Sequence, residues 1–553
     1  MSNEIYLEWL NNSNVSELLK IQMKSMSETE KAIAFNDKKI QFGTAGYRAK
    51  MGPGNHYLNE FTYKQLATGY AKFIKEKFHN LSKIKVLVVH DNRLNGAFFT
   101  DIVCTTLEKY NIIPVITKYN ELLPTPIASY LVRKMKLHGC INITASHNPK
   151  EYNGFKCYDS TGAQLLPNDS KKIIDFLPSW KEVLETKIEI NFKPYFVPKI
   201  FINRYFIDVY KSLIKTKYSP KYLNLVYSAM HGTASNYMSS FLNKLGYKCI
   251  DLVTQNYPDP NFTNTKICNP EDPQSLEDAI NFADIVNSNI VLASDPDADR
   301  LAIVIKKDNE WVFLNGNQAG IIETYYKLHN LKIKNKFVPV VISTYISTNL
   351  IDKIVKQFNG KVIRTPTGFK WIANEINNLR KNEVYINGFE EAIGALPSTI
   401  NRDKDSFQTA ALIMEIIYYY HNKSMDLVDL LEKEIYPKYG HWYGETTSIV
   451  INDLNWKEKA LLILEKLKTN DLDKICNREI VSKNFNEKAD AMEYYFEGDS
   501  WVKFRISGTE PKFKIYTNLF SKNDNFEYDT TYTKQLQIES FEIVEFIKKY
   551  LGL

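Results

Sequence analysis

The segment INITASHNPKEYNGFK, residues 141–156, begins as a strand and then turns polar around one serine, Ser146. Two other apolar runs end in the same way: SDPDADR follows the run at 290–293, and GFEEAIG follows the run at 384–386. Short Val- and Ile-rich runs that lead through a polar turn into a helical pattern are typical of α/β proteins. Because ligands bind beyond the carboxyl ends of the strands in open α/β sheets, these three turns are candidate site segments.

The spacing of these turns, roughly 95 to 150 residues, predicts successive α/β domains of about that size. Beyond residue 438 the pattern changes to TTSIVI, WVKFRIS, KIYTNLF and a closing helix over 538–550, which indicates a smaller α+β domain. The predicted fold class is therefore α/β, with three successive α/β domains of mixed sheets and a smaller C-terminal α+β domain. Further buried strands are predicted at 84–89, 223–227 and 338–342. The predicted domains are 1–199, with a helical extension over residues 1–35 packed outside domain 1, and then 200–317, 318–438 and 439–553.

Composition places the chain among soluble globular proteins. Its 553 residues are 44% apolar and 24% charged, so apolar side chains can offset the chain entropy of folding. The net charge of +6 is spread thinly, which favours anionic small ligands and argues against nucleic acid. Six cysteines without a C-x-x-C pair suggest neither a zinc knuckle nor a disulfide framework. The chain shows no secretory signal pattern and no apolar run near ~18 residues, which predicts a cytoplasmic protein without membrane contact.

Ser146 has two interpretations. Ser, Asn and Pro are all turn formers, so the serine could simply cap a helix or a turn. The sequence around it is not the G-x-S-x-G of a hydrolase nucleophile elbow, which disfavours acyl transfer. Phosphoryl transfer needs an oxygen nucleophile, a divalent cation and cationic groups on the phosphate, and Ser146 fits that chemistry. Lys156, which follows Asn153 and Gly154 in a predicted turn, could supply a cation or an acid/base group.

Three aspartates alternate along the second turn: Asp295, Asp297 and Asp299. Side chains spaced by two in an extended loop project to the same side, so these carboxylates can converge on one hard cation such as Mg²⁺. An EF-hand begins similarly but needs Gly and Glu where this chain has Arg300 and Lys306, so calcium sensing is disfavoured. The alternative is a solvated acidic turn, which mutual repulsion of the charges opposes.

The third turn, Asn387–Gly394, carries paired glutamates, Glu390 and Glu391. Their carboxylates could accept hydrogen bonds from vicinal sugar hydroxyls. They could equally cap the start of a following helix by interacting with its macrodipole. Upstream, RTPTGFKW offers a glycine turn with a hydroxyl and a cation, and downstream Arg402 and Lys404 add positive charge.

Two further glycine turns carry basic residues. RISGTEPK, residues 505–512, places two hydroxyls on a glycine turn flanked by Arg and Lys, which is what a phosphate-binding loop needs. Its alternative is an ordinary surface turn between strands. GTAGYR, residues 43–48, is a similar turn that ends in Arg48. Taken together, the five motifs supply a serine, a metal cradle, a hydroxyl-binding pair and two phosphate clamps.

In the order FGTAGYRA, TASHNPK, DPDADR, GFEEAIG and RISGTEPK, these motifs resemble the α-D-phosphohexomutase superfamily over nearly the whole chain. EWL near the start, GYRAKMGPG, MHGTAS, TPTGFKW and FEEAIG are most similar to the eukaryotic phosphoglucomutase-2 and phosphopentomutase branch. The resemblance implies four domains around a central cleft. It also implies that small-molecule sugar phosphates are the partners of a monomer or homodimer.

The resemblance further implies an intramolecular phosphotransferase: a phosphosugar mutase that moves a phosphoryl group between C1 and C6 of a hexose or C1 and C5 of a pentose. The reaction would pass through phosphorylated Ser146 and a bisphosphate intermediate. One Mg²⁺ per chain would be held by Ser146, through its phosphate, and by Asp295, Asp297 and Asp299. A sugar bisphosphate such as glucose 1,6-bisphosphate would act as activator.

The same resemblance assigns roles to the other motifs. Arg48 and Lys156 would assist at the reacting phosphate, and His147 and Lys156 are the candidates for the general acid/base. The implied contacts with substrate are Arg300, Thr367, Gly368, Glu390, Glu391, Lys404, Arg505, Ser507, Gly508, Thr509 and Lys512.

Two positions depart from the family pattern. Ala392 stands where many hexomutases have serine, a change shared with the phosphopentomutase-like branch, so the preferred sugar stays open. Ser406 follows Lys404 and Asp405 where many members have glycine. A sugar-bisphosphate synthase and a Mg²⁺-dependent sugar phosphatase are the alternative activities. A sensor without catalysis is disfavoured because Ser146 and the three aspartates are intact.

Overall fold

The computed structural model describes residues 2–43, 46–118, 121–215, 223–330, 336–451, 455–508, 511–521 and 531–553. They form two compact units, and each unit is described by itself. The first unit contains the described residues within 1–214, 218–301 and 399–408, and the second contains those within 215–217, 302–398 and 409–553.

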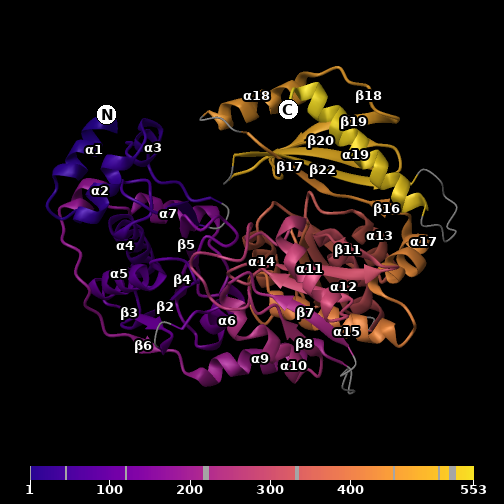
Figure 1. Ribbon diagram of the computed structural model, residues 1–553, viewed down its shortest axis with the longest axis horizontal. Coiled ribbons are helices and arrows are strands. Elements are labelled where there is room, and N and C mark those ends of the chain that lie inside the picture. Colours follow the sequence, from indigo (N-terminus) through magenta and orange to yellow (C-terminus); the bar gives the residue numbers. More distant parts are fainter. Residues whose placement is uncertain are drawn as a thin grey trace. The chain divides into compact units, whose positions relative to one another are not determined.

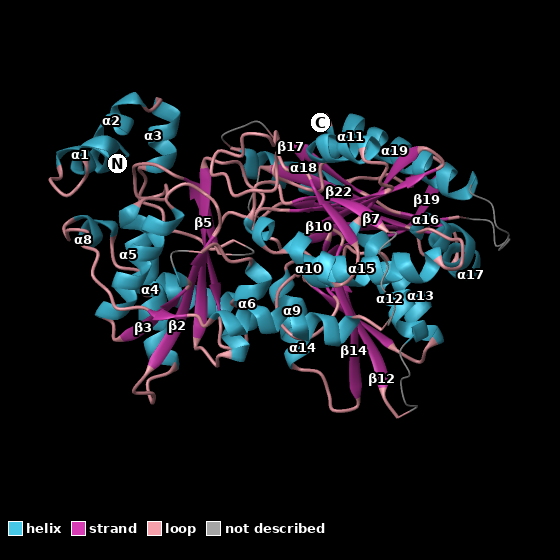
Figure 2. Ribbon diagram, turned by 60° about the horizontal axis from the view of Figure 1, so that its bottom comes forward, coloured by secondary structure: helices cyan, strands magenta, loops and turns pink. Residues whose placement is uncertain are grey.

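A six-stranded mixed sheet opens the first unit, in the order β1-β5-β4-β2-β3-β6. β5 runs antiparallel to its neighbours β4 and β1, whereas β2 is parallel to β3 and β4. α4 and α5 cover one face of this sheet and α6 covers the other (Figure 2). The central strands are therefore buried on both faces, which is why they are almost entirely apolar. The elements are β1 Tyr47–Lys50, α4 Glu60–Lys77, β2 Ile84–His90, α5 Gly96–Lys109, β3 Ile112–Ile116, α6 Thr125–Lys134, β4 Gly139–Ile143, β5 Tyr152–Tyr158, α7 Pro167–Asp175, α8 Trp180–Leu184 and β6 Tyr195–Phe196.

The predicted helical extension packs on this first sheet domain, as expected. Ser27 and Glu30 form a capping box at the start of its third helix. Trp9 is 1% exposed, and its ring meets Phe35 and Phe61 edge-on at centroid distances of 6.0 and 5.3 Å. Because Phe61 belongs to α4, the extension shares an aromatic core with the first domain. Its helices are α1 Ser2–Asn11, α2 Glu17–Ser25 and α3 Glu28–Ala34 (Figure 1).

The rest of the first unit contains three parallel strands in the order β8-β7-β9. β9 is buried over its whole length and ends at Ser294, directly before the acidic turn. Residues 399–408, which include the first three residues of α15 (Ser406–His421), also belong to this unit. The elements are α9 Lys199–Leu213, β7 Asn224–Ser228, the 3₁₀ helix η2 Thr233–Asn236, α10 Met238–Lys244, β8 Lys248–Asp251, η3 Pro273–Leu276, α11 Glu277–Ile285 and β9 Ile290–Ser294.

The second unit contains a four-stranded sheet in the order β13-β12-β14-β15. β12 is parallel to β13 and β14, and β15 returns antiparallel to β14. A hairpin joins β10 to β11 through Asp308 and Asn309, whose φ values of 49° and 66° suit a type I′ turn. The elements are β10 Leu301–Lys307, β11 Glu310–Leu314, α12 Gly316–Asn330, β12 Val338–Thr344, α13 Leu350–Gln357, β13 Lys361–Thr365, α14 Phe369–Asn377, β14 Glu383–Glu390, β15 Gly394–Leu396, α15 Ser406–His421, α16 Leu427–Asp429, the π-helix η4 Leu430–Ile435 and α17 Tyr436–Tyr439.

The C-terminal part of the second unit is a seven-stranded antiparallel sheet in the order β16-β22-β21-β20-β19-β18, with β17 also paired to β22. The long closing helix α19 lies across it (Figure 1). The buried stripe of α19 enters the core of this sheet through Ile543, Val544 and Ile547. The elements are β16 Trp442–Tyr443, β17 Thr446–Val450, α18 Trp456–Thr469, β18 Lys474–Ile475, β19 Arg478–Asn486, β20 Ala491–Phe496, β21 Trp501–Ile506, β22 Lys512–Phe520 and α19 Thr531–Leu551.

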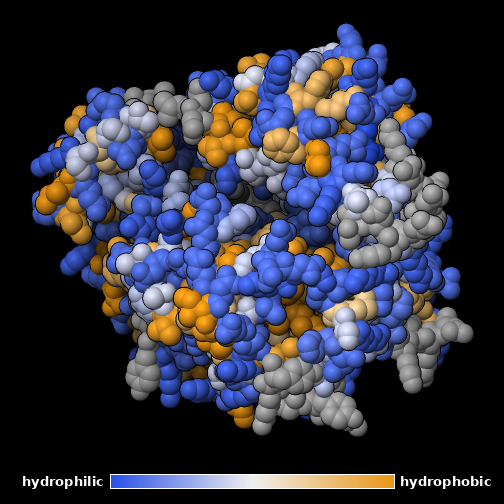
Figure 3. All heavy atoms as spheres, turned by 45° about the vertical axis from the view of Figure 1, so that its right-hand side comes forward, coloured by the Kyte–Doolittle hydropathy of each residue, from blue (hydrophilic) through white to orange (hydrophobic). Residues whose placement is uncertain are grey.

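The predicted fold class is confirmed: three α/β domains with mixed sheets precede a sheet-rich C-terminal domain. The strands predicted at 84–89, 223–227 and 338–342 correspond to β2, β7 and β12. The domain limits given above stay predictions. Among the described residues, no helix combines the length and the apolar character needed to cross a membrane. The face drawn in Figure 3 is mainly hydrophilic, with hydrophobic side chains in small separate groups.

We expect Trp9→Ala to detach the helical extension. Removing a buried indole costs about 3–5 kcal/mol, and Trp9 is the residue that joins both aromatic partners. The measurement is limited proteolysis with thermal unfolding, and the expected result is faster cleavage within residues 1–35. Leu18→Ala is the control, because Leu18 is 66% exposed on α2 and its loss should stay within about 0.5 kcal/mol. Equal cleavage rates in the two variants would contradict the proposed docking.

Candidate active site

Ser146 lies in the turn after β4, at the carboxyl end of the first sheet, and is 1% exposed. Its Oγ donates to Asp295 Oδ2 at 2.7 Å and lies 3.4 Å from Nδ1 of His147. Its backbone N–H donates to Thr144 Oγ1 at 2.9 Å. The φ of Ser146 is 52°, a left-handed conformation that is uncommon for a residue with a side chain. The turn therefore presents the hydroxyl to the acidic loop in a conformation that the surroundings must impose.

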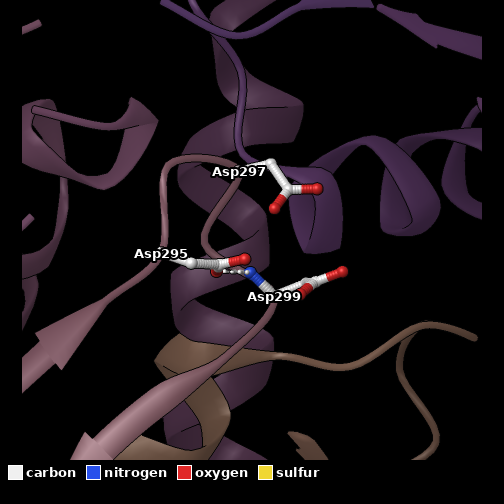
Figure 4. Close-up of side chains that lie close together, drawn as sticks. All are labelled: Asp295, Asp297 and Asp299. Atoms are coloured by element: carbon white, nitrogen blue, oxygen red, sulfur yellow. Dashed lines mark hydrogen bonds between the residues drawn. The ribbon is translucent and has the colours of Figure 1, made fainter. Parts of the chain in front are cut away.

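The acidic loop directly follows β9, and its three carboxylates come together as predicted. One carboxylate oxygen each from Asp295, Asp297 and Asp299 lies within 4.8 Å of the others. Oδ1 of Asp295 accepts the backbone N–H groups of Asp299 and Arg300, both at 3.0 Å, and this closes the loop. Figure 4 shows the three side chains and the bond between Asp299 and Asp295.

The donor set fits a hard divalent cation. Burial, and then the charges of Asp297 and Asp299, raises the pKa of Asp295 well above its usual range. Among the described residues, Oδ1 of Asp297 and Oδ1 of Asp299 are buried without a hydrogen-bond partner. Buried carboxylate oxygens without partners are what Mg²⁺ prefers as ligands. The three aspartates therefore suit the predicted metal site.

Two lysines contact Asp297 and Asp299. Nζ of Lys156 contacts Oδ2 of Asp297 and lies 3.3 Å from Oδ2 of Asp299, and Nζ of Lys404 lies 3.2 Å from that same Oδ2. Burial acts to lower the pKa of Lys156, but Asp297 and Asp299 outweigh it and the pKa is raised. Lys156 lies in the middle of β5, so the predicted turn around it is wrong. Gly154 allows the close approach of the neighbouring strand, because a Cβ at this position would lie 2.2 Å from the carbonyl oxygen of Thr144.

Arg48 and Arg300 flank this cluster. Nη1 of Arg48 donates to Oδ1 of Asn148 in the Ser146 turn at 3.0 Å, and burial lowers the pKa of Arg48. Nη1 of Arg300 lies 3.2 Å from a carboxylate oxygen of Glu271. The first unit therefore brings together eight predicted site residues in or beside the acidic loop: Arg48, Ser146, His147, Lys156, Asp295, Asp297, Asp299 and Lys404, with Arg300 next in the chain.

The acidic loop is also bound by residues that were not predicted as site residues. Thr125 donates its hydroxyl to Oδ2 of Asp297 at 3.0 Å. Thr233 donates both its N–H and its hydroxyl to the carbonyl of Pro296, at 2.8 and 3.0 Å. Gly232 sits so close that a Cβ would lie 2.4 Å from Cα of Pro296. Thr233 and Gly232 belong to MHGTAS, a motif that the sequence analysis used for the family resemblance. Nothing in the sequence indicated that this motif contacts the acidic loop.

The loop that carries Lys404 is fixed by the two acids beside it, which the sequence analysis did not assign. Oδ2 of Asp403 accepts from the hydroxyl of Tyr158 and from Nε2 of Gln164, both at 2.8 Å. Asp405 accepts the hydroxyl of Tyr205 at 2.7 Å, and burial raises the pKa of Asp405 to about 6. Ser406, the departure from glycine, uses its hydroxyl to donate to the carbonyl of Ala298 at 2.7 Å. These bonds place Lys404 beside Asp299.

In the second unit, the paired glutamates end β14. Oε1 of Glu390 accepts the backbone N–H of Gly368 at 2.8 Å, which connects the GFEEAIG and TPTGFKW motifs. Oε2 of Glu391 accepts the hydroxyl of Thr344 at 3.2 Å. β15 follows the glutamates instead of a helix, so the helix-capping alternative is wrong. Thr367 precedes Gly368 in the same turn.

The motif at 505–512 connects β21 to β22 as a hairpin. The N–H of Ser507 donates to the carbonyl of Lys512 at 2.9 Å across the base of the turn. Arg505 is half-buried at the end of β21, and Gly508 is exposed. Thr509 lies outside the described residues. The structure thus assigns to the second unit the predicted contacts Thr367, Gly368, Glu390, Glu391, Arg505, Ser507, Gly508 and Lys512.

Comparison with known proteins identifies three domain models. Those described as α/β/α domains I, II and III of phosphoglucomutase/phosphomannomutase match residues 39–183, 203–309 and 315–436, which is more than half of the chain. Among curated relatives, a phosphomannomutase of Mycoplasmoides pirum is 44% identical over 529 residues, covering 95% of this chain and 96% of the relative. A phosphoglucomutase of Staphylococcus aureus (strain MRSA252) is 29% identical over 539 residues, covering 92% of this chain and 95% of the relative.

Solved structures agree in fold. The chain superimposes on the phosphoglucomutase parafusin of Paramecium, in its open form, with a TM-score of 0.68 at 19% identity, covering 94% of this chain and 96% of that one. A phosphoglucomutase/phosphomannomutase family protein of Burkholderia thailandensis gives a TM-score of 0.66 at 18% identity, covering 92% of this chain and 97% of that one.

We expect Asp297→Asn to weaken divalent cation binding by about tenfold or more, equivalent to about 1.4 kcal/mol. The variant removes one of the three charges from the cradle while keeping the size of the side chain. The measurement is a titration with Mn²⁺ followed by electron paramagnetic resonance of the free ion. Asp308→Asn is the matched control, because Asp308 is exposed at a φ of 49° that Asn tolerates. Unchanged affinity in Asp297→Asn would remove this loop as the cation site.

Proposed function

The chain belongs to the phosphoglucomutase/phosphomannomutase family, and on that premise we propose that it is a phosphosugar mutase that works through phosphorylated Ser146. The observation that carries the proposal is the bond of 2.7 Å from Ser146 Oγ to Asp295, inside a cluster of three carboxylates and two lysines. Phosphoryl transfer requires an oxygen nucleophile, a cation site and positive charge at one point, and this cluster supplies all three.

In the proposed first half-reaction, phosphorylated Ser146 gives its phosphoryl group to a free hydroxyl of a monophosphosugar. The bond from phosphorus to Oγ breaks, a bond from phosphorus to the sugar oxygen forms, and the sugar hydroxyl loses its proton while Oγ gains one. The second half-reaction returns the other phosphate of the resulting bisphosphate to Ser146. Adding free sugar bisphosphate would restore any enzyme that had lost its phosphate, which is the basis for a bisphosphate activator.

The residues around Ser146 support particular roles in these steps. His147 Nδ1, 3.4 Å from Oγ, and Lys156 are the two candidates for moving the proton at that atom. Lys156 and Lys404, already held beside the carboxylates, supply positive charge for the transferring group. Arg48, bonded to the Ser146 turn through Asn148, is placed to contact the same phosphate.

Mg²⁺ bound to Asp295, Asp297 and Asp299 would neutralise charge on the transferring phosphoryl group. Arg300 would contact the substrate next to that loop. The sugar hydroxyls would be bound by Glu390 and Glu391, because carboxylates accept hydrogen bonds from vicinal hydroxyls. Thr367 and Gly368 would add contacts from the turn whose Gly368 N–H donates to Glu390. The hairpin carrying Arg505, Ser507, Gly508, Thr509 and Lys512 would bind the phosphate that is not reacting.

Two features bear on the preferred sugar. The relatives named above are a phosphomannomutase and a phosphoglucomutase, which favours transfer between C1 and C6 of a hexose. Ala392, in place of a serine hydroxyl, favours the phosphopentomutase branch and transfer between C1 and C5. We propose the hexose reaction as the main activity, because the relative at 44% identity spans 95% of this chain.

We expect Ser146→Ala to abolish turnover and to leave sugar-phosphate binding within about tenfold, or about 1.4 kcal/mol. The variant removes only the hydroxyl that accepts the phosphoryl group. Isomerisation is measured with glucose 1-phosphate and mannose 1-phosphate, and binding is measured by calorimetry. Ser160→Ala, an exposed serine of the same domain, is the control and should keep full activity. Residual turnover in Ser146→Ala would exclude this serine as the nucleophile.

We expect the wild-type protein to isomerise mannose 1-phosphate and glucose 1-phosphate with a kcat/KM at least about tenfold above that for ribose 1-phosphate. Each assay contains Mg²⁺ and a trace of sugar bisphosphate, and both the isomer and free phosphate are followed. Free phosphate in place of isomer would mean that water reaches the phosphoserine and that the protein is a phosphatase. Net accumulation of bisphosphate from another phosphate donor would indicate the synthase alternative. A higher rate with ribose 1-phosphate would assign the pentose branch.

A further inference from the structure

A three-residue segment, Asp91 to Arg93, directly follows β2 and faces the turn that carries Ser146. β2 and β4 are parallel neighbours, and His90 pairs with Ile143 at their carboxyl ends. The N–H of Asp91 continues this ladder by donating to the carbonyl of Ile143 at 3.1 Å. The segment therefore leaves the sheet next to the point where the Ser146 turn begins.

The guanidinium of Arg93 makes most of its hydrogen bonds to the turn that carries Ser146. Arg93 is 3% exposed, and none of its four side-chain bonds to the turn goes to a side chain. All four go to main-chain carbonyl oxygens, that of Ser146 itself and three that follow it in the turn. The acceptors are Ser146 at 2.7 Å, Asn148 at 2.5 Å, Pro149 at 2.7 Å and Tyr152 at 2.8 Å.

Other contacts hold the guanidinium itself in place. Nε of Arg93 donates to Oδ2 of Asp91 at 3.1 Å, and the backbone N–H of Arg93 donates to Oδ1 of the same carboxylate at 2.9 Å. The ring of Phe262 covers the guanidinium at 5.4 Å from its centroid. Asn92 donates to the carbonyl of Asp259 at 2.8 Å, which fixes the turn that carries Phe262. The bond from Arg93 to the carbonyl of Ser146 is buried, and a low local dielectric strengthens it.

We propose that Arg93 is a positioning residue for phosphoryl transfer at Ser146: its guanidinium binds four carbonyls and holds the serine in its left-handed conformation. This rests on the proposed function, because it assigns Arg93 to the same reaction. Without the guanidinium, the carbonyls of Ser146, Asn148 and Tyr152 lose the donor recorded here, and that of Ser146 is buried, whereas the carbonyl of Pro149 keeps the N–H of Tyr152 at 3.0 Å. Ser146, at a φ of 52°, would relax and carry Oγ away from Asp295.

The planar fork of arginine is essential to this role. One guanidinium directs its N–H groups at several acceptors in one plane, whereas a lysine ammonium is a compact point charge. Arg93→Lys keeps the charge and loses the geometry. If Arg93 acted only through its charge, Arg93→Lys would be close to wild type.

The test compares Arg93→Ala and Arg93→Lys with wild type in the isomerase assay. We expect kcat to fall about 100-fold in both, since displacing a reacting group by about 1 Å costs that much, while KM stays within about threefold. Guanidinium chloride at low millimolar concentration should restore Arg93→Ala by about tenfold, and sodium chloride should not, because a free guanidinium can occupy the empty site. Hydrogen exchange of residues 141–156 should be faster in both variants and should slow again with guanidinium.

Arg133→Ala is the matched control. Arg133 also donates from Nη1 to a main-chain carbonyl, that of Thr161 at 3.0 Å, but makes no bond to the Ser146 turn among those the structure records. It should lose stability without losing kcat and should not respond to guanidinium. Arg93→Lys is the fallback where Arg93→Ala does not fold.

The proposal is overturned if either Arg93 variant keeps wild-type kcat, or if guanidinium restores neither kcat nor exchange protection. Failure of the proposed function looks different, since the wild-type protein itself would then form no isomer. In that case hydrogen exchange still tests Arg93, because the protection of residues 141–156 does not depend on turnover.

Discussion

Three carboxylates buried on one short loop are the constraint around which the first unit is built. Taking one ionised carboxylate out of water costs several kcal/mol, and placing three within 4.8 Å adds repulsion. Lys156 and Lys404 offset this cost at Asp297 and Asp299, and two backbone N–H groups donate to Asp295. Two carboxylate oxygens still have no hydrogen-bond partner among the described residues, so the protein's own hydrogen bonds do not satisfy all three carboxylates. A divalent cation would, and that shortfall is the physical reason to expect one.

All but one of the side chains in this cluster come from the end or the middle of a strand, where the sheet fixes their position. β9 delivers the acidic loop, β4 delivers Ser146 and β5 delivers Lys156. Only Lys404 comes from an irregular loop, and there the neighbouring acids Asp403 and Asp405 bind tyrosine hydroxyls to give the rigidity that a strand would have supplied. Rigid placement of the charges thus precedes any contact with substrate.

The site could be predicted from the sequence where a reactive or metal-binding side chain directly follows a buried strand, as at Ser146 and the three aspartates. The sequence did not reveal Arg93, which also follows a buried strand, because the bonds from Arg93 to the main-chain carbonyls of the Ser146 turn leave no pattern in the sequence. It could not connect Tyr158 with Asp403, because their bond joins residues 245 positions apart. It misplaced Lys156 because Asn-Gly usually indicates a turn. In β5 the glycine instead admits the carbonyl of Thr144, a contact that is visible only once two strands are paired.

The backbone adds a further argument about where function lies. Left-handed φ values occur mostly at Gly, Asn and Asp, and they are outliers for residues with larger or branched side chains. Ser146 (52°), Ala298 (60°) and Ile393 (45°) have such values, one in each of the three turns that followed strand ends in the sequence. Residues keep an unfavourable φ only where surrounding bonds impose it, and such residues cluster at functional sites. For Ser146 the imposing group is Arg93, and for the acidic loop that contains Ala298 it is Asp295, which accepts the next two N–H groups. The Ser146 turn and the acidic loop are therefore held in their conformations by bonds from the protein itself.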